Sequence, residues 1–170
     1  HAWVPMLHIN YQLGVDGISL WLIVLAAFIS LIAVCFSLDR DVGFRNFMAL
    51  LLALEAGTLG VFVALDLILF YVFWELMLVP TYFLIGIWGE GRRIYATTKF
   101  VLYTLVGSLF MLLGIIWLSL IHFEATHELS FNIQTLVHMK IDPSTQIWLF
   151  LFFLSAFAIK IPIFPLHSWL

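Results

Sequence analysis

The chain has 170 residues, a formal net charge of -3, 64% apolar residues and only 10% charged residues, and its mean hydropathy is +1.13. A soluble domain averages about 45–50% apolar and about 25% charged residues, and a soluble fold of this size has too small an interior for so many apolar side chains. We therefore expect lipid to be the solvent. The small net charge indicates no nucleic-acid partner.

The apolar runs predict an all-α fold, a polytopic transmembrane bundle that forms a single domain over residues 1–170. A helix needs about 20 apolar residues to cross the hydrocarbon core of a bilayer. Residues 122–146 are polar and are expected outside the membrane. The five predicted spans are residues 18–38, 46–65, 67–88, 97–121 and 147–161, with a break and a continuation to residue 170.

Two features divide the apolar runs. The run from 46 to 88 holds roughly 43 residues, which as one helix would extend about 64 Å, twice the membrane. A turn is therefore expected at Asp66, whose carboxylate can cap the helix that follows. Near the end of the chain, Pro162 and Pro165 lie too close together for an unbroken helix. The last span is therefore predicted to be discontinuous or sharply kinked.

Basic residues indicate the orientation. Arg40 and Arg45 lie between the first two spans, and Arg92 and Arg93 lie between the third and fourth. The opposite side carries one lysine among three acids. Because positively charged loops face the cytoplasm, both arginine loops are predicted to be cytoplasmic. The two loops fall on the same side when the chain has five spans. The chain starts at a histidine and stops without a polar tail, so we expect a piece of a longer membrane protein.

Three ionisable residues are expected deep in the bilayer: Glu75, Lys160 and Glu55. Glu75 follows the turn at Asp66 by nine residues, which places it about 13 Å from the membrane surface. Such groups cost several kcal/mol unless they are paired, hydrated or neutral. Each can be a buried polar clamp satisfied by a neighbour, or part of an ion path. For Glu75 and Lys160 we favour the ion path, whereas Glu55 is open to both interpretations.

Chemistry favours the proton as the ion. Burial disfavours the charged form of a side chain, and a neighbouring opposite charge restores it. Glu75 and Lys160 are each followed by a proline, Pro80 and Pro162, which frees backbone carbonyls for hydration. A Glu75–Lys160 couple in a hydrated channel is therefore predicted to take up and release a proton as its separation changes. A sodium site would need several oxygens gathered together, and the sequence has no such cluster.

Two further residues are secondary candidates for proton transfer. His167 can extend a proton path because imidazole titrates near neutral pH, although a lone histidine is commonly a hydrogen-bonded structural residue. Lys99 lies near the start of the fourth span, where its amine can also reach the membrane surface. The chain has one cysteine, no glycine-rich phosphate loop and no regular histidine spacing. We therefore expect no metal, nucleotide, flavin or iron–sulfur centre in this chain.

Three long segments carry a family resemblance. They resemble the antiporter-like subunits of respiratory complex I (NADH:quinone oxidoreductase), and YQLGVDGISLWLIVL is similar to the start of a helix in the same family. The ending PLHSWL is most similar to the M-type members, which are called chain 4 in organelles. The three segments are ALDLILFYVFWELMLVPTYFLIGIWG, ATTKFVLYT and AFAIKIPIFPLHSWL.

The resemblance implies a fold of about fourteen helices with two inverted five-helix repeats, of which this chain would be the first. The family's glutamate on the fifth helix and lysine on the broken seventh helix map onto Glu75 and Lys160, the input half of a proton path. The lysine near the sixth helix maps onto Lys99, and Glu55 matches a carboxylate common in M-type members. The second half of the path is missing from this chain.

The expected function is therefore that of a proton-translocating subunit of NADH:quinone oxidoreductase, a translocase without redox chemistry in this chain. The resemblance implies other membrane subunits, lipids and protons as partners. It also implies NADH, quinone, flavin and iron–sulfur clusters in other subunits. A bacterial plasma membrane is favoured, with an organellar inner membrane or a thylakoid as alternatives. The alternative functions are a subunit of a related cation/proton antiporter or membrane-bound hydrogenase, and a passive membrane scaffold.

Overall fold

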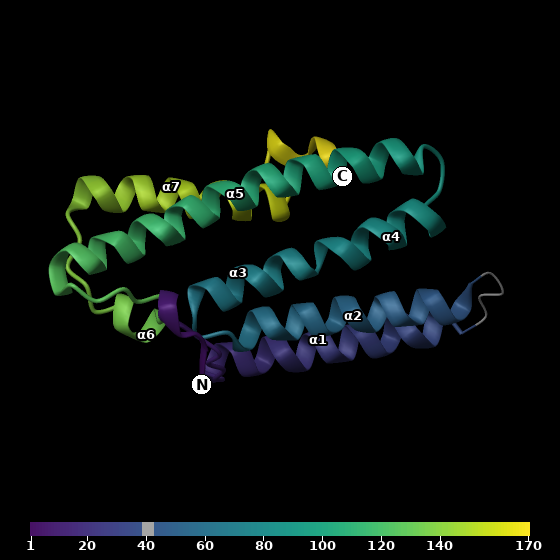
Figure 1. Ribbon diagram of the computed structural model, residues 1–170. Helices are drawn as coiled ribbons and strands as arrows, with labels where there is room; N and C mark the ends of the chain where they lie inside the picture. Colours follow the sequence, from purple (N-terminus) through teal and green to yellow (C-terminus); the bar gives the residue numbers. More distant parts are fainter. Residues whose placement is uncertain (39–42) are drawn as a thin grey trace.

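The structure is a computed structural model that describes residues 1–38 and 43–170 (Figure 1). Arg40, expected in the first cytoplasmic loop, lies outside the described residues. The elements in chain order are β1 (Ala2–Val4), η1 (Pro5–Leu7), β2 (Ile9–Asn10), α1 (Gly17–Phe36), α2 (Phe44–Val63), α3 (Leu67–Leu76), α4 (Leu78–Trp88), α5 (Arg93–Thr126), α6 (Ile133–Leu136), α7 (Pro143–Lys160) and η2 (Leu166–Trp169).

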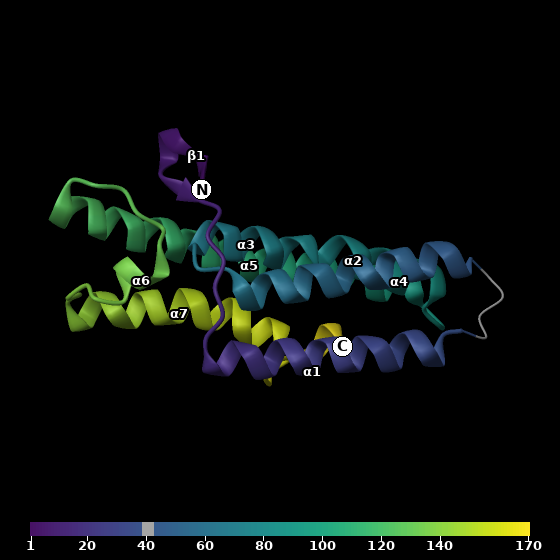
Figure 2. The same ribbon diagram turned by 90° about the horizontal axis from the view of Figure 1, so that it is seen from below.

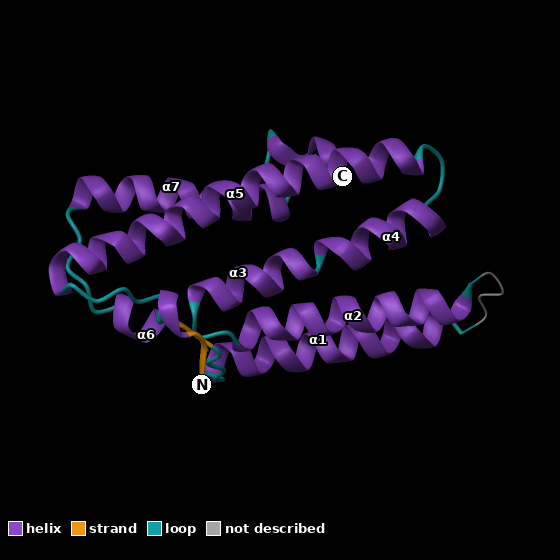
Figure 3. Ribbon diagram, in the orientation of Figure 1, coloured by secondary structure: helices purple, strands orange, loops and turns teal. Residues whose placement is uncertain are grey.

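The helices pack in the order in which they occur in the chain. Helix α1 contacts α2, α2 contacts α3 and α4, both of these contact α5, and α5 forms a long interface with α7. Figure 1 shows α1 and α2 along the lower edge, α3 and α4 in the middle, and α5 and α7 along the upper edge. Figure 2, seen from below, shows the same long helices lying side by side. The only sheet among the described residues is the antiparallel pair β1–β2 near the N-terminus (Figure 3).

Five segments of the described chain are long and apolar enough to cross a membrane, with α3 and α4 counting together as one. The predicted all-α bundle with five spans is therefore confirmed. Many large apolar side chains on these helices are exposed, and α1 buries none of its residues. Such a surface is stable only when lipid covers it.

The third span is interrupted, whereas the sequence predicted one helix from 67 to 88. Helix α3 ends at Leu76, and α4 begins at Leu78. Pro80 has no N–H to donate to the carbonyl of Leu76, and its ring crowds that carbonyl, so the helical ladder opens one turn before the proline. Met77 at the interruption packs against Gly57 of α2, where an added Cβ would lie 2.8 Å from the Met77 side chain.

The fourth span is longer than the predicted 97–121. Helix α5 begins at Arg93 and ends at Thr126, so its last turn enters the segment expected outside the membrane. The prediction ended the helix at the first polar residue, His122, but polarity marks a membrane boundary rather than the end of a helix. The His122 ring nitrogen Nδ1 lies 2.8 Å from the carbonyl oxygen of Glu128, which fastens this last turn. The fifth helix also begins earlier than predicted, at Pro143.

Asp66 forms the expected turn and cap. Its carboxylate accepts hydrogen bonds from the backbone N–H groups of Ile68 (2.9 Å) and Leu69 (3.2 Å). It also accepts one from the N–H of Asn10, 56 residues earlier, at 3.1 Å. Asp66 is completely buried. The side chain therefore joins the N-terminal segment to the start of α3 and leaves little of its hydrogen-bonding capacity unused.

Small residues allow α5 to approach α7 closely. Thr104, Gly107, Ser108 and Gly114 are all buried on α5. A Cβ added at Gly107 would lie 2.8 Å from the Ile159 side chain of α7. Because glycine has no side chain, the two helix backbones can pack closely. Close packing of this kind drives the association of membrane helices, since apolar side chains gain no free energy by leaving lipid for a helix interface. This packing fixes the C-terminal end of α7 next to α3 and α5.

Candidate functional site

The predicted acid lies at the interruption of the third span. Glu75 is the last residue but one of α3, directly before the opening at Met77. Its side chain is half-buried, and its Oε1 atom is buried without a hydrogen-bond partner among the described residues. A buried carboxylate oxygen that accepts no hydrogen bond is costly, because it has lost water without gaining a donor. This oxygen is therefore available to a proton, a water molecule or a mobile cation.

The predicted amine lies at the interruption of the last span. Lys160 is the final residue of α7, and the chain then turns through Pro162 toward η2. The N–H of Ile161 still reaches the carbonyl of Phe157, and the N–H of Ile163 reaches that of Ala158 at 2.9 Å. The helix therefore opens directly behind Lys160. The predicted discontinuity of this span is thus where the sequence placed it.

Trp74, the residue directly before Glu75, contacts the Lys160 amine. The Lys160 Nζ atom lies 4.8 Å from the centroid of the Trp74 ring. The same ring meets Phe157 of α7 edge-on, with 5.6 Å between centroids. No ion pair joins Glu75 to Lys160 within the part of the chain that the structure describes. The two side chains are nevertheless near enough for an electrostatic interaction between their charges. The acid and the amine are thus neighbours without direct contact.

Two hydroxyl groups extend the polar region beyond Glu75. Tyr71 lies one helical turn before Glu75 on α3 and interacts with that carboxylate and with the Ser108 hydroxyl. Ser108, on α5, is only 1% exposed. Tyrosine and serine hydroxyls can both donate and accept hydrogen bonds. The Glu75 carboxylate therefore has polar neighbours on α3 and α5 as well as on α7.

Lys99 and His167 belong to a second group, around η2. The Lys99 Nζ atom donates a hydrogen bond to the carbonyl oxygen of Ser168, and the Ser168 hydroxyl donates to the Tyr103 hydroxyl at 2.9 Å. His167 is exposed and stacks on Phe164, with 5.6 Å between ring centroids. Lys99 therefore holds the segment that follows the α7 break. Neither residue contacts Glu75 through any recorded interaction of the described chain.

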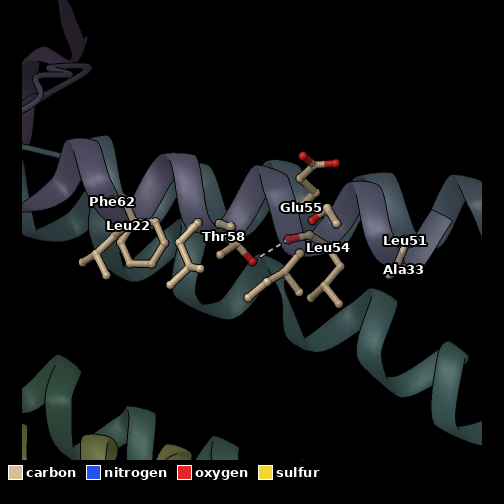
Figure 4. A pocket seen from close by; sticks show the side chains of 11 residues that line it. Leu22, Ala33, Leu51, Leu54, Glu55, Thr58 and Phe62 are labelled. Carbon is tan, nitrogen blue, oxygen red and sulfur yellow. Dashed lines mark hydrogen bonds between the residues drawn. The ribbon is translucent and has the colours of Figure 1, made fainter. Parts of the chain in front are cut away.

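Glu55 lies apart from the other candidates, in a groove between α1 and α2. This groove has a volume of about 360 Å³ and is lined almost entirely by apolar side chains, with Ser30 and Thr58 as its other polar members. Figure 4 shows the Glu55 carboxylate directed away from Phe62 and Thr58, while Thr58 donates to the carbonyl of Leu54 at 2.8 Å. The structure therefore does not bring Glu55 together with Lys160.

Sequence reasoning missed the two tryptophans of the site. Trp74 touches Lys160, and the Trp169 indole Nε1 donates to the carbonyl of Ile159 at 2.8 Å, one residue before Lys160. The proximity of Trp74 to Glu75 in the chain was a usable signal, since an aromatic face next to an acid also attracts cations. Among residues 1–38 and 43–170, no cluster of three histidine, cysteine or acidic side chains could hold a metal ion.

The fold and the site together define an integral membrane protein whose interrupted helices carry ionisable groups beside the interruptions, a construction typical of ion transporters. Residues 64–170 match the family model described as NADH:quinone oxidoreductase/Mrp antiporter, transmembrane. The chain belongs to this family. The predicted family resemblance and the predicted membrane location are therefore confirmed.

Individual relatives agree with the family assignment. The chloroplastic NAD(P)H-quinone oxidoreductase chain 4 of Adiantum capillus-veneris is 40% identical over 168 residues, which are 99% of this chain and 33% of the relative. Its counterpart from Physcomitrium patens is 41% identical over 170 residues, 100% of this chain and 33% of the relative. The chain thus spans about a third of the length of the curated relatives it matches.

Two solved structures resemble the fold. Respiratory complex I from Thermus thermophilus with bound NADH contains a chain that matches with a TM-score of 0.84 and 35% identity, covering 98% of this chain and 34% of that one. An archaeal respiratory complex, the membrane-bound sulfane sulfur reductase, contains another, with a TM-score of 0.71 and 26% identity, covering 92% of this chain and 24% of that one. The same helical arrangement therefore occurs in different redox complexes.

Proposed function

We propose that this chain forms the input half of a proton path in a translocating subunit of an NADH:quinone oxidoreductase. One observation carries the proposal: Glu75 and Lys160 lie at the interruptions of two neighbouring spans, and a buried oxygen of Glu75 accepts no hydrogen bond in the described structure. An acid left open at depth is suited to bind and release a proton. The family membership supports the same function.

Glu75 holds the proton in this proposal, and Lys160 controls how tightly it is held. When the Lys160 ammonium approaches Glu75, it stabilises the ionised carboxylate, and the proton leaves. When the ammonium withdraws, the carboxylate again binds a proton from the aqueous side. The opening behind Lys160 gives the amine room to move, while the α5–α7 packing keeps the helix in place. A conformational or electrostatic change in the complex would drive the movement.

The remaining candidates have different proposed roles. We assign Lys99 to positioning of the segment after the α7 break, because its amine is bonded to the Ser168 carbonyl. Onward transfer through His167 stays a prediction. Glu55 lies between α1 and α2, so we leave it outside the Glu75–Lys160 couple. Electron transfer, with its flavin and iron–sulfur clusters, and the sites for NADH and quinone are assigned to other subunits of the complex.

The test uses the full-length protein within its assembled complex, reconstituted into vesicles. Replacement of Glu75 by Gln or of Lys160 by Met should lower the rate of proton pumping at least about tenfold. A neutral side chain at either position is expected to raise the activation free energy of proton transfer by more than about 1.4 kcal/mol. Proton uptake is measured by a pH-sensitive dye during substrate oxidation. Glu124→Gln is the matched control, because Glu124 is exposed near the end of α5.

Two outcomes would contradict the proposal. Unchanged pumping in Glu75→Gln and Lys160→Met would exclude these groups from the path. Lost assembly in the same variants, with Glu124→Gln assembled normally, would favour a scaffold whose charges lock the helices together. Native gel electrophoresis of the membranes separates the two results, because it reports the intact complex independently of its activity.

A second candidate function is that of the corresponding subunit in a cation/proton antiporter or in a redox complex that does not use NADH. The similarity to a chain of the sulfane sulfur reductase complex favours it. The subunits that copurify with the full-length protein distinguish the candidates. Flavin- and iron–sulfur-containing partners that oxidise NADH support the first function, whereas their absence supports the second.

A further inference from the structure

The Lys160 amine lies over the face of the Trp74 ring. The Nζ atom lies 4.8 Å from the ring centroid, within the roughly 6 Å over which a cation is attracted to an aromatic face. Tryptophan has the strongest such face among the aromatic residues, and the attraction grows when water is excluded. Lys160 is itself half-buried. Its amine is therefore partly shielded from water, which strengthens the attraction to the ring.

The ring is held in a fixed orientation. Phe70, one turn earlier on α3, lies 5.7 Å away between centroids, and Phe157 of α7 meets the ring edge-on at 5.6 Å. The Trp74 side chain also packs against the apolar core cluster around Met111. A tryptophan packed by both helices presents the same face to the α7 break whether or not the amine is present. The ring is therefore a preformed position for a cation.

Lys160 thus has two neighbouring positions available. One is the Trp74 face, where the amine lies in this structure, and the other is the open Oε1 of Glu75, on the next residue of α3. A lysine side chain has a flexible four-carbon stem, so its amine can move from one residue toward the next by changes of rotamer. A neutral amine gains little from the ring face, so this position favours the protonated form.

We propose that Trp74 is a positioning residue that holds the Lys160 ammonium away from Glu75 during proton uptake. This proposal rests on the proposed function. With the ammonium on the indole, the Glu75 carboxylate binds one proton from the path, and a single O–H bond forms. When the ammonium moves to Glu75, that O–H bond breaks, and the proton passes onward while Lys160 keeps its own three hydrogens. No oxidant or reductant takes part.

The experiment grades the electrostatics of the ring while keeping its shape. Tryptophan analogues with one, two and three fluorine atoms are inserted at position 74 of the full-length protein in its complex, because fluorine weakens the negative face of the ring stepwise. Pumping should fall progressively, by about two- to tenfold across the series. The same analogues at Trp117, whose ring packs edge-on to Phe152, serve as the control and should leave pumping unchanged.

A spectroscopic measurement tests the contact itself. The fluorine NMR signal of 5-fluorotryptophan at position 74 should move when Lys160 is replaced by Met, and it should stay in place in Lys140→Met. Lys140 is the matched control because it is exposed before the start of α7.

The proposal requires both results, and a failure of either overturns it. A flat response to fluorination, with pumping still abolished by Glu75→Gln, would exclude Trp74 and leave the proposed function intact. An unmoved fluorine signal in Lys160→Met would exclude the contact. If Glu75→Gln itself pumps normally, the proposed function fails, and the Trp74 proposal fails with it.

Discussion

An acid lies at each end of helix α3, Asp66 as its N-cap and Glu75 in its last turn, and the two acids have different hydrogen-bonding environments. Asp66 is fully buried at the N-terminus and accepts three backbone N–H groups, one from a segment 56 residues away. Glu75 is half-buried near the C-terminus and leaves Oε1 without a donor. A satisfied acid stabilises one arrangement of the chain. An unsatisfied acid can change its proton, its partner or both, which is the property a transport site needs.

The largest expected effect tests the stabilising role of Asp66. Asp66→Ala should lower the free energy of unfolding by roughly 2–4 kcal/mol, because it removes a helix cap and leaves three backbone N–H donors, one of them buried, without this acceptor. Glu75→Gln should change it by less than about 1 kcal/mol. Thermal unfolding of the detergent-solubilised protein measures both. A larger loss in Glu75→Gln than in Asp66→Ala would reverse the comparison between the two acids.

The next effect concerns the packing that orients α3. A Cβ added at Gly60 of α2 would lie 2.3 Å from a ring atom of Phe73, two residues before Glu75. Gly60→Ala should therefore destabilise the protein by about 1–3 kcal/mol, because the Phe73 ring and the α2 backbone must separate. Gly86→Ala is the control, since its nearest neighbour there lies at 3.7 Å. Equal unfolding temperatures for the two variants would show that α2 does not set the position of α3.

A smaller effect is expected where η2 meets the end of α7. Trp169→Phe keeps a ring next to Phe100, whose centroid lies 5.1 Å from that of Trp169, but loses the donor to the Ile159 carbonyl. The expected loss of stability is about 1 kcal/mol. Amide hydrogen exchange of residues 157–163 should be faster in this variant than in the wild type. Unchanged exchange would mean that the break behind Lys160 is held by other contacts.

The smallest expected effect is on stability and concerns Asp16, an exposed helix cap that contrasts with the buried cap Asp66. Asp16 caps α1, and the backbone N–H of Ser19, with further donation from its hydroxyl and from Ile18, lowers the pKa of Asp16 below 3.8. A lowered folded pKa gives stability that is present above the unfolded value and is lost as the pH falls through the folded value. The unfolding temperatures of wild type and Asp16→Asn should therefore differ near neutral pH and converge as the pH falls through the lowered pKa of Asp16. A constant difference would assign the effect to something other than this carboxylate.

The sequence predicted much of this arrangement, because its main determinants are local. The lengths of the apolar runs predicted the five spans, and the position of Asp66 predicted the turn before α3. Pro162 and Pro165 predicted the break after Lys160. Polarity misplaced the end of α5, because His122 continues the helix instead of ending it. Pro80 was noticed, but the opening of the helix at Met77 was not predicted.

The contacts between helices could not be predicted in the same way. The Trp74–Lys160 contact joins residues 86 positions apart, and it depends on the packing of α3 and α7 against α5. The Trp169–Ile159 hydrogen bond depends on how the chain turns after the break. Depth along a helix follows from counting residues, whereas the direction of a side chain toward another helix follows from tertiary packing.

The length of α5 has a consequence for its surroundings. With 34 residues, it extends about 51 Å, whereas the hydrocarbon core of a bilayer is about 30 Å thick. To fit within the hydrocarbon core by tilting alone, α5 would need a tilt above about 50°, whereas membrane helices reach roughly 40°. Part of α5 therefore lies outside the hydrocarbon core in any bilayer of ordinary thickness. A probe attached at Glu124, on the final turns, would remain accessible from the adjacent aqueous compartment and would mark its side of the membrane.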